Sequence, residues 1–435
     1  MRQLASLSSR LGEHTCGGDS ERRTTVRRVT WSPGPRASWV DDANAGRIPG
    51  MRPRPGAFDA AELIEAALAR HDGGGTIDPS IDEPLRIICD GLETTAELTP
   101  LGRWGTQRYL DRLLDVHLGL SDWARSDQEG ASAEIEAPVF VIGAPRTGTT
   151  ALHRLLAADP RHRAPTGWEF LFPLPPPDPA TVETDPRIEI AAAELTFPQS
   201  VSTGLRTIHT YSAQMPKECL SAMSFAFRSE EFVSRYHLPA YVDWLRQCDM
   251  TPAYDAHRLV LGALQRRSPD RRWVLKSPVH LQSVPELIAT YPDATFVVTH
   301  RDPGAVIASV SSLIATMRAA FSDDVDPHEI AAYHLDLYSR SLRLLVDHVV
   351  AGVLPAGRTV HVAHADIVAD PNRVLAQVHD VLGYEPDPST TAEVLGEERE
   401  DKVGAHRYDP SDFGLDAGAI DAAFAEYRAH FLEGR

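Results

Sequence analysis

The sequence predicts an α/β fold, in which a parallel sheet is flanked by helices and is joined to a helical N-terminal unit and a helical insertion on the substrate side. Three observations support this fold class. From Pro138 onward, short β-rich runs alternate with helical patterns. The first run leads into a glycine loop and then into an amphipathic helix, which is the order of a phosphate-binding P-loop. Between residues 173 and 272 the alternation stops, and aromatic-rich helical segments replace it.

Residues 1–55 are expected to form a disordered basic extension. The first 50 residues carry eight arginines against five acids, and they contain neither apolar periodicity nor the hydrophobic segment of a signal peptide. Pro and Gly residues then punctuate the chain up to residue 56. Both Met1 and Met51 remain open as the natural start.

Residues 56–130 are predicted to form the helical N-terminal unit. Thr99 suits the N-cap of its longest helix, and Pro100 suits the first helical position. Apolar residues at helical spacing follow, including Leu110, Leu113 and Leu114. This unit shows packing patterns and no motif that carries chemistry.

The main domain is predicted to span residues 136–435, with its insertion at about 184–265. Ligands of open parallel sheets bind beyond the carboxyl ends of the strands, so we expect the insertion to cover that edge and to supply substrate contacts. The predicted strands are 139–142, 273–276, 294–300 and 359–364, and the predicted helices are about 149–158, 279–290, 303–317 and 371–382.

Composition narrows the classes of function. The 435 residues suggest two or three structural units, and the net charge of −18 argues against a broad nucleic-acid-binding surface. No run approaches the ~18 consecutive apolar residues of a membrane span. The four cysteines lack metal-binding or redox spacing, which favours reduced thiols in a cytoplasmic protein. The composition is compatible with a monomer and with a homo-oligomer.

The glycine loop "GAPRTGTT" departs from the usual P-loop at one position. Gly143 and Gly148 have the spacing of G-x-x-x-x-G-K-[ST], but Thr149 stands where the lysine belongs. Backbone N–H groups and Arg146 can still hold one phosphate, whereas a triphosphate with magnesium would be poorly served. The sequence therefore predicts no metal, and Asp302 is interpreted as a helix cap.

This loop and three later segments resemble the P-loop sulfotransferases, which use 3′-phosphoadenosine-5′-phosphosulfate (PAPS), in the branch common among actinobacteria. The later segments begin "WVLKSPVHL", "HVAHADIV" and "HRYDPSDFGL", and the resemblance covers roughly residues 85 to 435. Arg301, followed by Ser309 eight residues later, resembles the family's 3′-phosphate site. The resemblance implies these cofactor-binding residues: Gly143, Ala144, Pro145, Arg146, Thr147, Gly148, Thr149, Thr150, Arg301, Ser309 and Arg407.

The resemblance also implies catalytic roles. Sulfuryl transfer needs positive groups where charge develops, and Arg146 and the strand-end Lys276 are the candidates. The acceptor hydroxyl needs a base. Glu169 is the first candidate and His280 its rival, while Glu218 and His209 in the insertion are weaker ones.

The function implied is transfer of a sulfuryl group from PAPS to a hydroxyl of a small-molecule, lipid or glycan acceptor. The aromatic insertion favours a partly apolar alcohol over a large anionic glycan. Two alternatives remain, an ATP-dependent small-molecule kinase and a non-catalytic nucleotide-binding module. Thr149 at the lysine position disfavours the kinase, and the set of cations at the strand ends disfavours the module.

Overall fold

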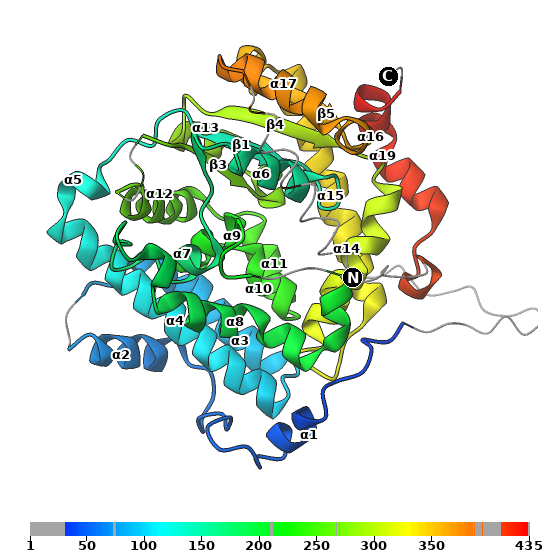
Figure 1. The fold of residues 1–435 in the computed structure, drawn as a ribbon. Helices are drawn as coiled ribbons and strands as arrows, with labels where there is room; N and C mark the ends of the chain where they lie inside the picture. The colour runs from blue at the N-terminus through cyan, green and yellow to red at the C-terminus, as the bar shows by residue number, and fades with distance from the viewer. Residues whose placement is uncertain are drawn as a thin grey trace, which may run out of the picture.

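The protein is built on a five-stranded, fully parallel sheet with the strand order β2-β3-β1-β4-β5 (Figure 1). The structure is a computed structural model that describes residues 31–72, 75–208, 212–266, 268, 270–385, 387, 394 and 410–433. The strands are β1 (Val139–Ile142), β2 (His162–Arg163), β3 (Arg272–Lys276), β4 (Thr295–His300) and β5 (Thr359–Ala363). The predicted parallel sheet is confirmed, and β1 lies at its centre.

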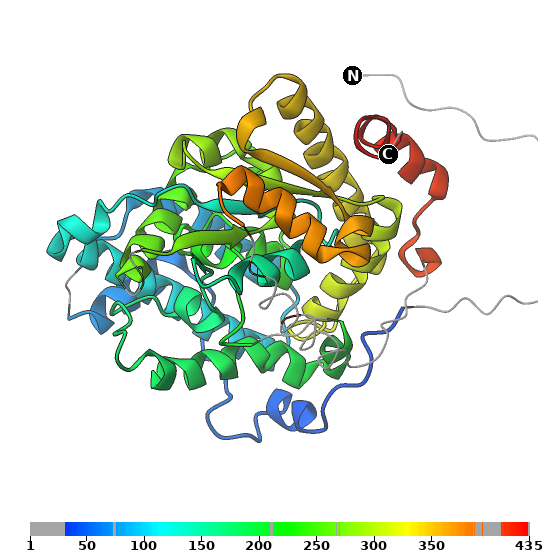
Figure 2. The same cartoon turned by 45° about the horizontal axis from the view of Figure 1, so that its top comes forward.

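Alternate residues of the central strand face two helical layers. Val139 and Val141 pack in a core with α6 (Thr149–Ala157), α16 (His364–Ala369) and α17 (Pro371–Leu382). Figure 2 shows α17, in orange, lying across the strands. Phe140 and Ile142 belong to the larger core on the other face. That side carries α12 (Thr251–Gln265), α13 (Val284–Thr290), α14 (Gly304–Arg318), α15 (Pro327–Val350) and α19 (Ala417–Phe431).

One predicted helix, over 279–290, is divided in two. A short 3₁₀ helix, η5 (Pro278–Gln282), is followed by α13, in which Pro285 occupies the first turn. Proline lacks the N–H that a continuous helix would require there, so the helix restarts. The 3₁₀ helix η5 therefore directly follows the end of β3 as a separate element.

The N-terminal unit is helical, as predicted. It comprises α2 (Ala60–Arg70), α3 (Asp82–Thr94), α4 (Pro100–Ser126) and α5 (Gln128–Ala131). The Thr99 hydroxyl accepts a hydrogen bond from Gly102 N, and Pro100 begins α4, which confirms the predicted cap. Among the described residues, no helix combines the length and apolarity that crossing a membrane requires.

The expected disordered extension needs a correction from residue 31 onward. Residues 39–44 form α1 (Trp39–Asn44), whose Val40 and Ala43 are buried in the large core. Arg36 forms an ion pair with Asp323, and Ala37 N donates to Val201 O at 3.3 Å. Two buried apolar side chains are too few to give a periodic pattern in the sequence. They are nevertheless enough to pack this short helix against the core. Residues 1–30 lie outside the described part.

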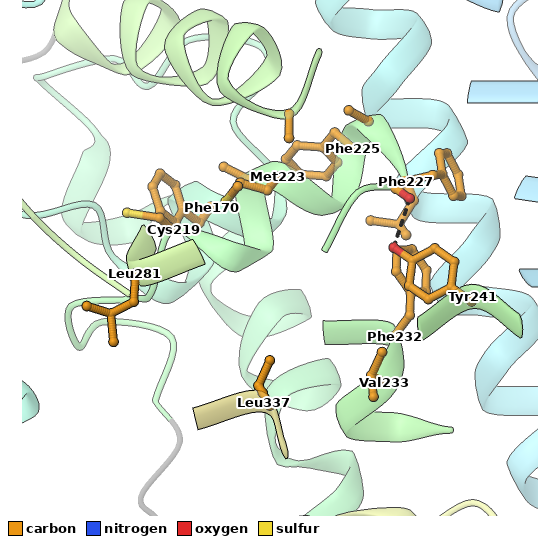
Figure 3. Close-up of a cluster of buried hydrophobic side chains, with 14 of the residues drawn as sticks. Phe170, Cys219, Met223, Phe225, Phe227, Phe232, Val233, Tyr241, Leu281 and Leu337 are labelled. Carbon is orange, nitrogen blue, oxygen red and sulfur yellow. Dashed lines mark hydrogen bonds between the residues drawn. The ribbon is translucent and has the colours of Figure 1, made fainter. Parts of the chain in front are cut away.

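The insertion is helical and contains an aromatic cluster. It follows α7 (Gly167–Leu171) and comprises α8 (Arg187–Val201), α9 (Leu220–Met223), α10 (Glu230–Arg235), α11 (Pro239–Leu245) and α12. Figure 3 shows Phe227, Phe232 and Tyr241 packed together, and the Tyr241 hydroxyl donates to Phe227 O at 2.9 Å. The cluster therefore fixes the segment from α9 to α10, in which Glu218 precedes α9 and α10 carries Glu230 and Glu231.

Candidate functional site

The glycine loop joins β1 to α6 at the carboxyl edge of the sheet. Gly143, Arg146 and Gly148 all have positive φ, at +154°, +65° and +91°. A Cβ on Gly143 would lie 2.3 Å from the Thr299 hydroxyl oxygen, so only glycine fits beside β4. The loop thus curls closely around the start of α6, as a phosphate-binding loop requires.

Three threonines of the loop have different environments. The Thr147 hydroxyl is buried, donates to Ala144 O at 2.6 Å and contacts the Thr299 hydroxyl at 2.6 Å. The side-chain hydroxyl of Thr147, a residue predicted to bind the cofactor, is therefore already engaged within the protein. Thr149 is also buried, whereas Thr150 is exposed. Thr150 is therefore the loop threonine whose side chain is open to a ligand.

Lys276 connects the loop to the insertion. It ends β3, is almost fully buried, and donates to the Thr150 hydroxyl at 3.3 Å and to Glu218 Oε1 at 2.5 Å. The backbone holds Glu218 in place, because the next residue, Cys219, donates its N–H to Lys276 O at 3.0 Å. A cation, a hydroxyl and a carboxylate from three segments thus meet at the first turn of α6.

Arg301 follows β4 on the other side of the loop. Its Nη1 donates to Arg146 O at 2.7 Å, and Ser309 lies buried in the second turn of α14. His364, at the start of α16, is the third basic group here. Burial lowers the pKa of His364, and the charges of Arg301 and Arg146 lower it further, which indicates that the three groups share one basic edge.

The C-terminal helix holds both neighbours of Arg301. The Tyr427 hydroxyl lies 2.9 Å from His300 Nδ1, and Arg428 forms two hydrogen bonds with Asp302, at 2.9 and 3.0 Å. Asp302 Oδ1 also accepts from Gly304 N at 2.8 Å, so it bonds the first residue of α14, although the N-cap residue itself is Pro303 and not Asp302 as predicted. The pKa of Asp302 is lowered despite burial, which acts in the opposite direction, because Arg428 and the Gly304 N–H favour the carboxylate.

The Glu169 side chain is buried and makes contacts that stabilise the start of α7. It is fully buried, accepts from Thr166 N and from the Thr166 hydroxyl at 2.9 Å each, and pairs with Arg163 at 2.7 Å. Thr166 and Glu169 form a capping box at the start of α7. The predicted base is therefore committed to a helix terminus, and the T-x-x-E spacing of "TGWE" could have indicated this.

His280 is also buried away from the loop. Its Nδ1 contacts the Tyr254 hydroxyl at 3.0 Å, and its ring packs edge-on against Phe140. Burial, with a smaller effect of His257, holds the pKa of His280 well below its usual value. The structure therefore does not support either leading base candidate, because neither side chain lines the cavity described next.

A cavity of about 220 Å³ opens beside Lys276. Thr150, Lys276 and Glu218 line one end, and apolar side chains of α14 line a wall: Val310, Leu313, Ile314 and Met317. We call this the acceptor cavity. Glu218, a weaker candidate in the sequence, is thus the carboxylate that the fold brings to Lys276. Lys276 and Glu218 are 58 positions apart, and no local sequence pattern predicts a contact over that separation.

Two predicted site residues, Arg407 and His209, lie outside the described residues. Elsewhere in the described chain, buried Asp159, His162 and His379 place potential metal ligands within 4.8 Å of one another. Protein groups already engage these atoms: Arg161 bonds both oxygens of Asp159, and the Tyr384 hydroxyl contacts His162 Nε2. This cluster forms at the end of α6 remote from the glycine loop, and the proposed chemistry does not use it.

Comparisons with known proteins show which proteins the chain resembles. The sulfotransferase family model matches residues 138–388. The chain is 26% identical over 265 residues to the omega-hydroxy-beta-dihydromenaquinone-9 sulfotransferase Stf3 of Mycobacterium bovis, over 57% of this chain and 63% of that relative's length. The structure of sulfotransferase STF1 from Mycobacterium tuberculosis superposes with a TM-score of 0.74 and 30% identity, over 86% of this chain and all of that one. STF9 from Mycobacterium avium gives 0.76 and 25%, over 88% and 100%.

Proposed function

Because this chain belongs to the sulfotransferase family, we propose that it transfers a sulfuryl group from PAPS to a hydroxyl of a small, partly apolar acceptor. One observation carries the proposal. Lys276 Nζ contacts both Thr150 of the glycine loop and Glu218 of the insertion, at the end of the acceptor cavity. The donor and the acceptor would therefore meet at one buried cation.

The glycine loop suits the donor's 5′-phosphosulfate. Its backbone N–H groups and the N-terminus of α6 can bind the phosphate without the lysine of a nucleotide triphosphate site. Arg301 and Ser309 are proposed for the 3′-phosphate, and Arg146 for the same anionic donor, on the resemblance to the family. Their positions along β4, α14 and the loop support that assignment.

The reaction that we assign to the site is an in-line displacement at the sulfur atom of the donor. The acceptor oxygen attacks the donor sulfur and forms a new S–O bond, while the bond from sulfur to the bridging phosphate oxygen breaks. The acceptor's proton passes to the Glu218 carboxylate, and 3′,5′-adenosine bisphosphate leaves. Lys276 stabilises the charge that develops on the sulfuryl oxygens and on the leaving phosphate. Glu218 replaces Glu169 in the role of base because it lines the cavity and Glu169 does not.

The acceptor proposed is a lipophilic alcohol. The apolar wall formed by α14 would bury a hydrocarbon body, and the polar end would hold its hydroxyl. The relative from Mycobacterium bovis is named for an omega-hydroxy menaquinone acceptor, which is the same chemical class. A cytoplasmic location, favoured by the scattered cysteines, is part of the proposal.

The proposal is tested with purified protein, PAPS labelled in the sulfuryl group, and a panel of lipid alcohols. We expect a labelled sulfate ester and the bisphosphate in equal amounts, with the same rate in the presence of a metal chelator. Phosphorylation of the same alcohols by ATP with magnesium would instead identify the kinase. Binding of PAPS with no transfer to any hydroxyl would favour the non-catalytic module.

A further inference from the structure

We infer that the acceptor cavity continues past Glu230 into a second cavity, so that the acceptor is an elongated alkyl or polyprenyl alcohol whose far end lies in that second cavity. This inference rests on the proposed function for the position of the hydroxyl. The second cavity measures about 150 Å³, and Glu230 and Val279 line both cavities. A single layer of side chains therefore separates the two spaces.

The partition, formed by Glu230 and Val279, and the reacting end involve different residues of the cavity lining. Glu230 begins α10 and Val279 belongs to η5, whereas Lys276 and Glu218 form the reacting end. Tyr338 of α15 lines the same cavity. Burial raises the pKa of Tyr338, and the charges of Glu230 and Glu218 raise it further, which is consistent with both carboxylates facing the same space.

Neutral groups hold the partition closed. Glu230 Oε1 accepts a hydrogen bond from Gln282 Nε2 at 2.7 Å, and the carboxylate also bonds the Tyr333 side chain. The other two carboxylates of the acceptor cavity have cationic partners, Glu218 with Lys276 and Glu231 with Arg235. Arg246 and Arg340 also act on Glu230 through their charges. Among the described residues, however, moving the Glu230 side chain aside breaks hydrogen bonds to neutral groups and no ion pair within 4 Å, which is the smaller cost.

Apolar side chains in part of the second cavity's wall suit the end of a hydrocarbon chain. They are Met223, Leu245, Cys248 and Met250, and thioethers adapt readily to apolar ligands. Polar residues line the rest, including Arg228, Arg246 and Glu286. The Arg228 guanidinium donates to Asp249 O at 3.0 Å and to Ala226 O at 3.1 Å, and Arg246 pairs with Asp336 at 2.5 Å. Both cations are thus engaged within the protein, so the site favours an alkyl end over an anionic one.

The test is the affinity of the full chain for hexanol and for dodecanol, measured by calorimetry without donor. Cys248→Trp fills the second cavity, and Ala240→Trp is the matched control, since Ala240 is exposed and does not line either cavity. We expect Cys248→Trp to weaken dodecanol binding by about tenfold or more and to leave hexanol unchanged, because only the longer chain loses buried methylenes. The control should match the wild type for both alcohols.

Gln282→Ala gives a second, independent reading if the tryptophan disturbs folding. It removes one bond of the partition, so dodecanol should bind more tightly while hexanol binds as before. Equal effects of Cys248→Trp on both alcohols, or no effect of either variant on dodecanol, would overturn the inference. Length-dependent binding without formation of any sulfate ester would leave the second cavity standing and would contradict the proposed function.

Discussion

Arg428 of the C-terminal helix forms two hydrogen bonds with Asp302, a residue 126 positions earlier and next to Arg301. The preceding residue, Tyr427, holds His300 on the other side of Arg301. Two consecutive residues of α19 therefore fix both neighbours of the arginine that we assign to the 3′-phosphate. The cofactor site depends in this way on a helix that does not itself supply a ligand in our proposal.

Arg301→Ala should remove most of the preference for 3′,5′-adenosine bisphosphate over AMP. A hydrogen bond to a charged group contributes about 1.5–3 kcal/mol, so the affinity for the bisphosphate should fall by roughly 10- to 150-fold. AMP lacks the 3′-phosphate, and its affinity should hardly change. Calorimetric titration of both nucleotides measures the two values. An undiminished preference in the variant would remove Arg301 from the site.

Arg428→Ala should weaken bisphosphate binding by less, about threefold to tenfold, because it releases Asp302 and leaves Arg301 itself intact. Arg428→Lys should recover part of the loss, since it keeps the charge. Asp421→Ala is the control: it removes the other partner of Arg428 on α19 and leaves the pair with Asp302 in place. If Asp421→Ala weakened binding as much as Arg428→Ala did, the positioning role of the Asp302 pair would be wrong.

Stability should fall as the pH drops below neutral, and buried histidines should be one cause. Burial lowers the pKa of His257 from 6.5 to about 3, and its Nε2 has no hydrogen-bond partner among the described residues. The unfolded chain takes up a proton below about pH 6.5 while the folded chain does not, so protonation favours unfolding between those two values. At about pH 5 this histidine should cost about 2 kcal/mol.

Urea unfolding at about pH 7.5 and pH 5 measures this effect. His257→Phe loses the bond to the Tyr291 hydroxyl and is less stable at both values, but its free energy of unfolding should decrease less between them. The quantity compared is thus the difference between the two pH values, not stability itself. A variant with the same pH dependence as the wild type would show that His257 does not titrate on unfolding.

Local patterns in the sequence predicted the sheet and the glycine loop. Apolar runs bounded by glycine or proline specify β1 and the loop after it, and Thr99 with Pro100 specifies the start of α4. The two-residue strand β2 was missed, because so short a segment leaves no periodic pattern. The family assignment, which the comparisons confirm, rested on the same local motifs.

The contacts of the site were less predictable, because they join distant parts of the chain. The pair of Lys276 with Glu218 depends on how the insertion folds back over β3. For Glu169, the local pattern pointed to the observed role. The sequence contains the T-x-x-E pattern of a capping box, but the position of Glu169 downstream of the loop resembled that of the family's base, and this resemblance led to the prediction. Spacing along a chain does not determine which carboxylate reaches a cavity.

The most direct measurement is the rate of sulfuryl transfer by Glu218→Gln, compared with Glu169→Gln, under saturating PAPS and a lipid alcohol. Glu218→Gln keeps the shape and removes the base, so turnover should fall by about 10²–10⁴-fold while bisphosphate affinity stays near the wild-type value. Glu169→Gln removes a charge that Arg163 holds in the core, so it should lower stability and leave turnover per folded molecule nearly unchanged. Near-normal turnover by Glu218→Gln together with loss of transfer by a folded Glu169→Gln protein would contradict the account.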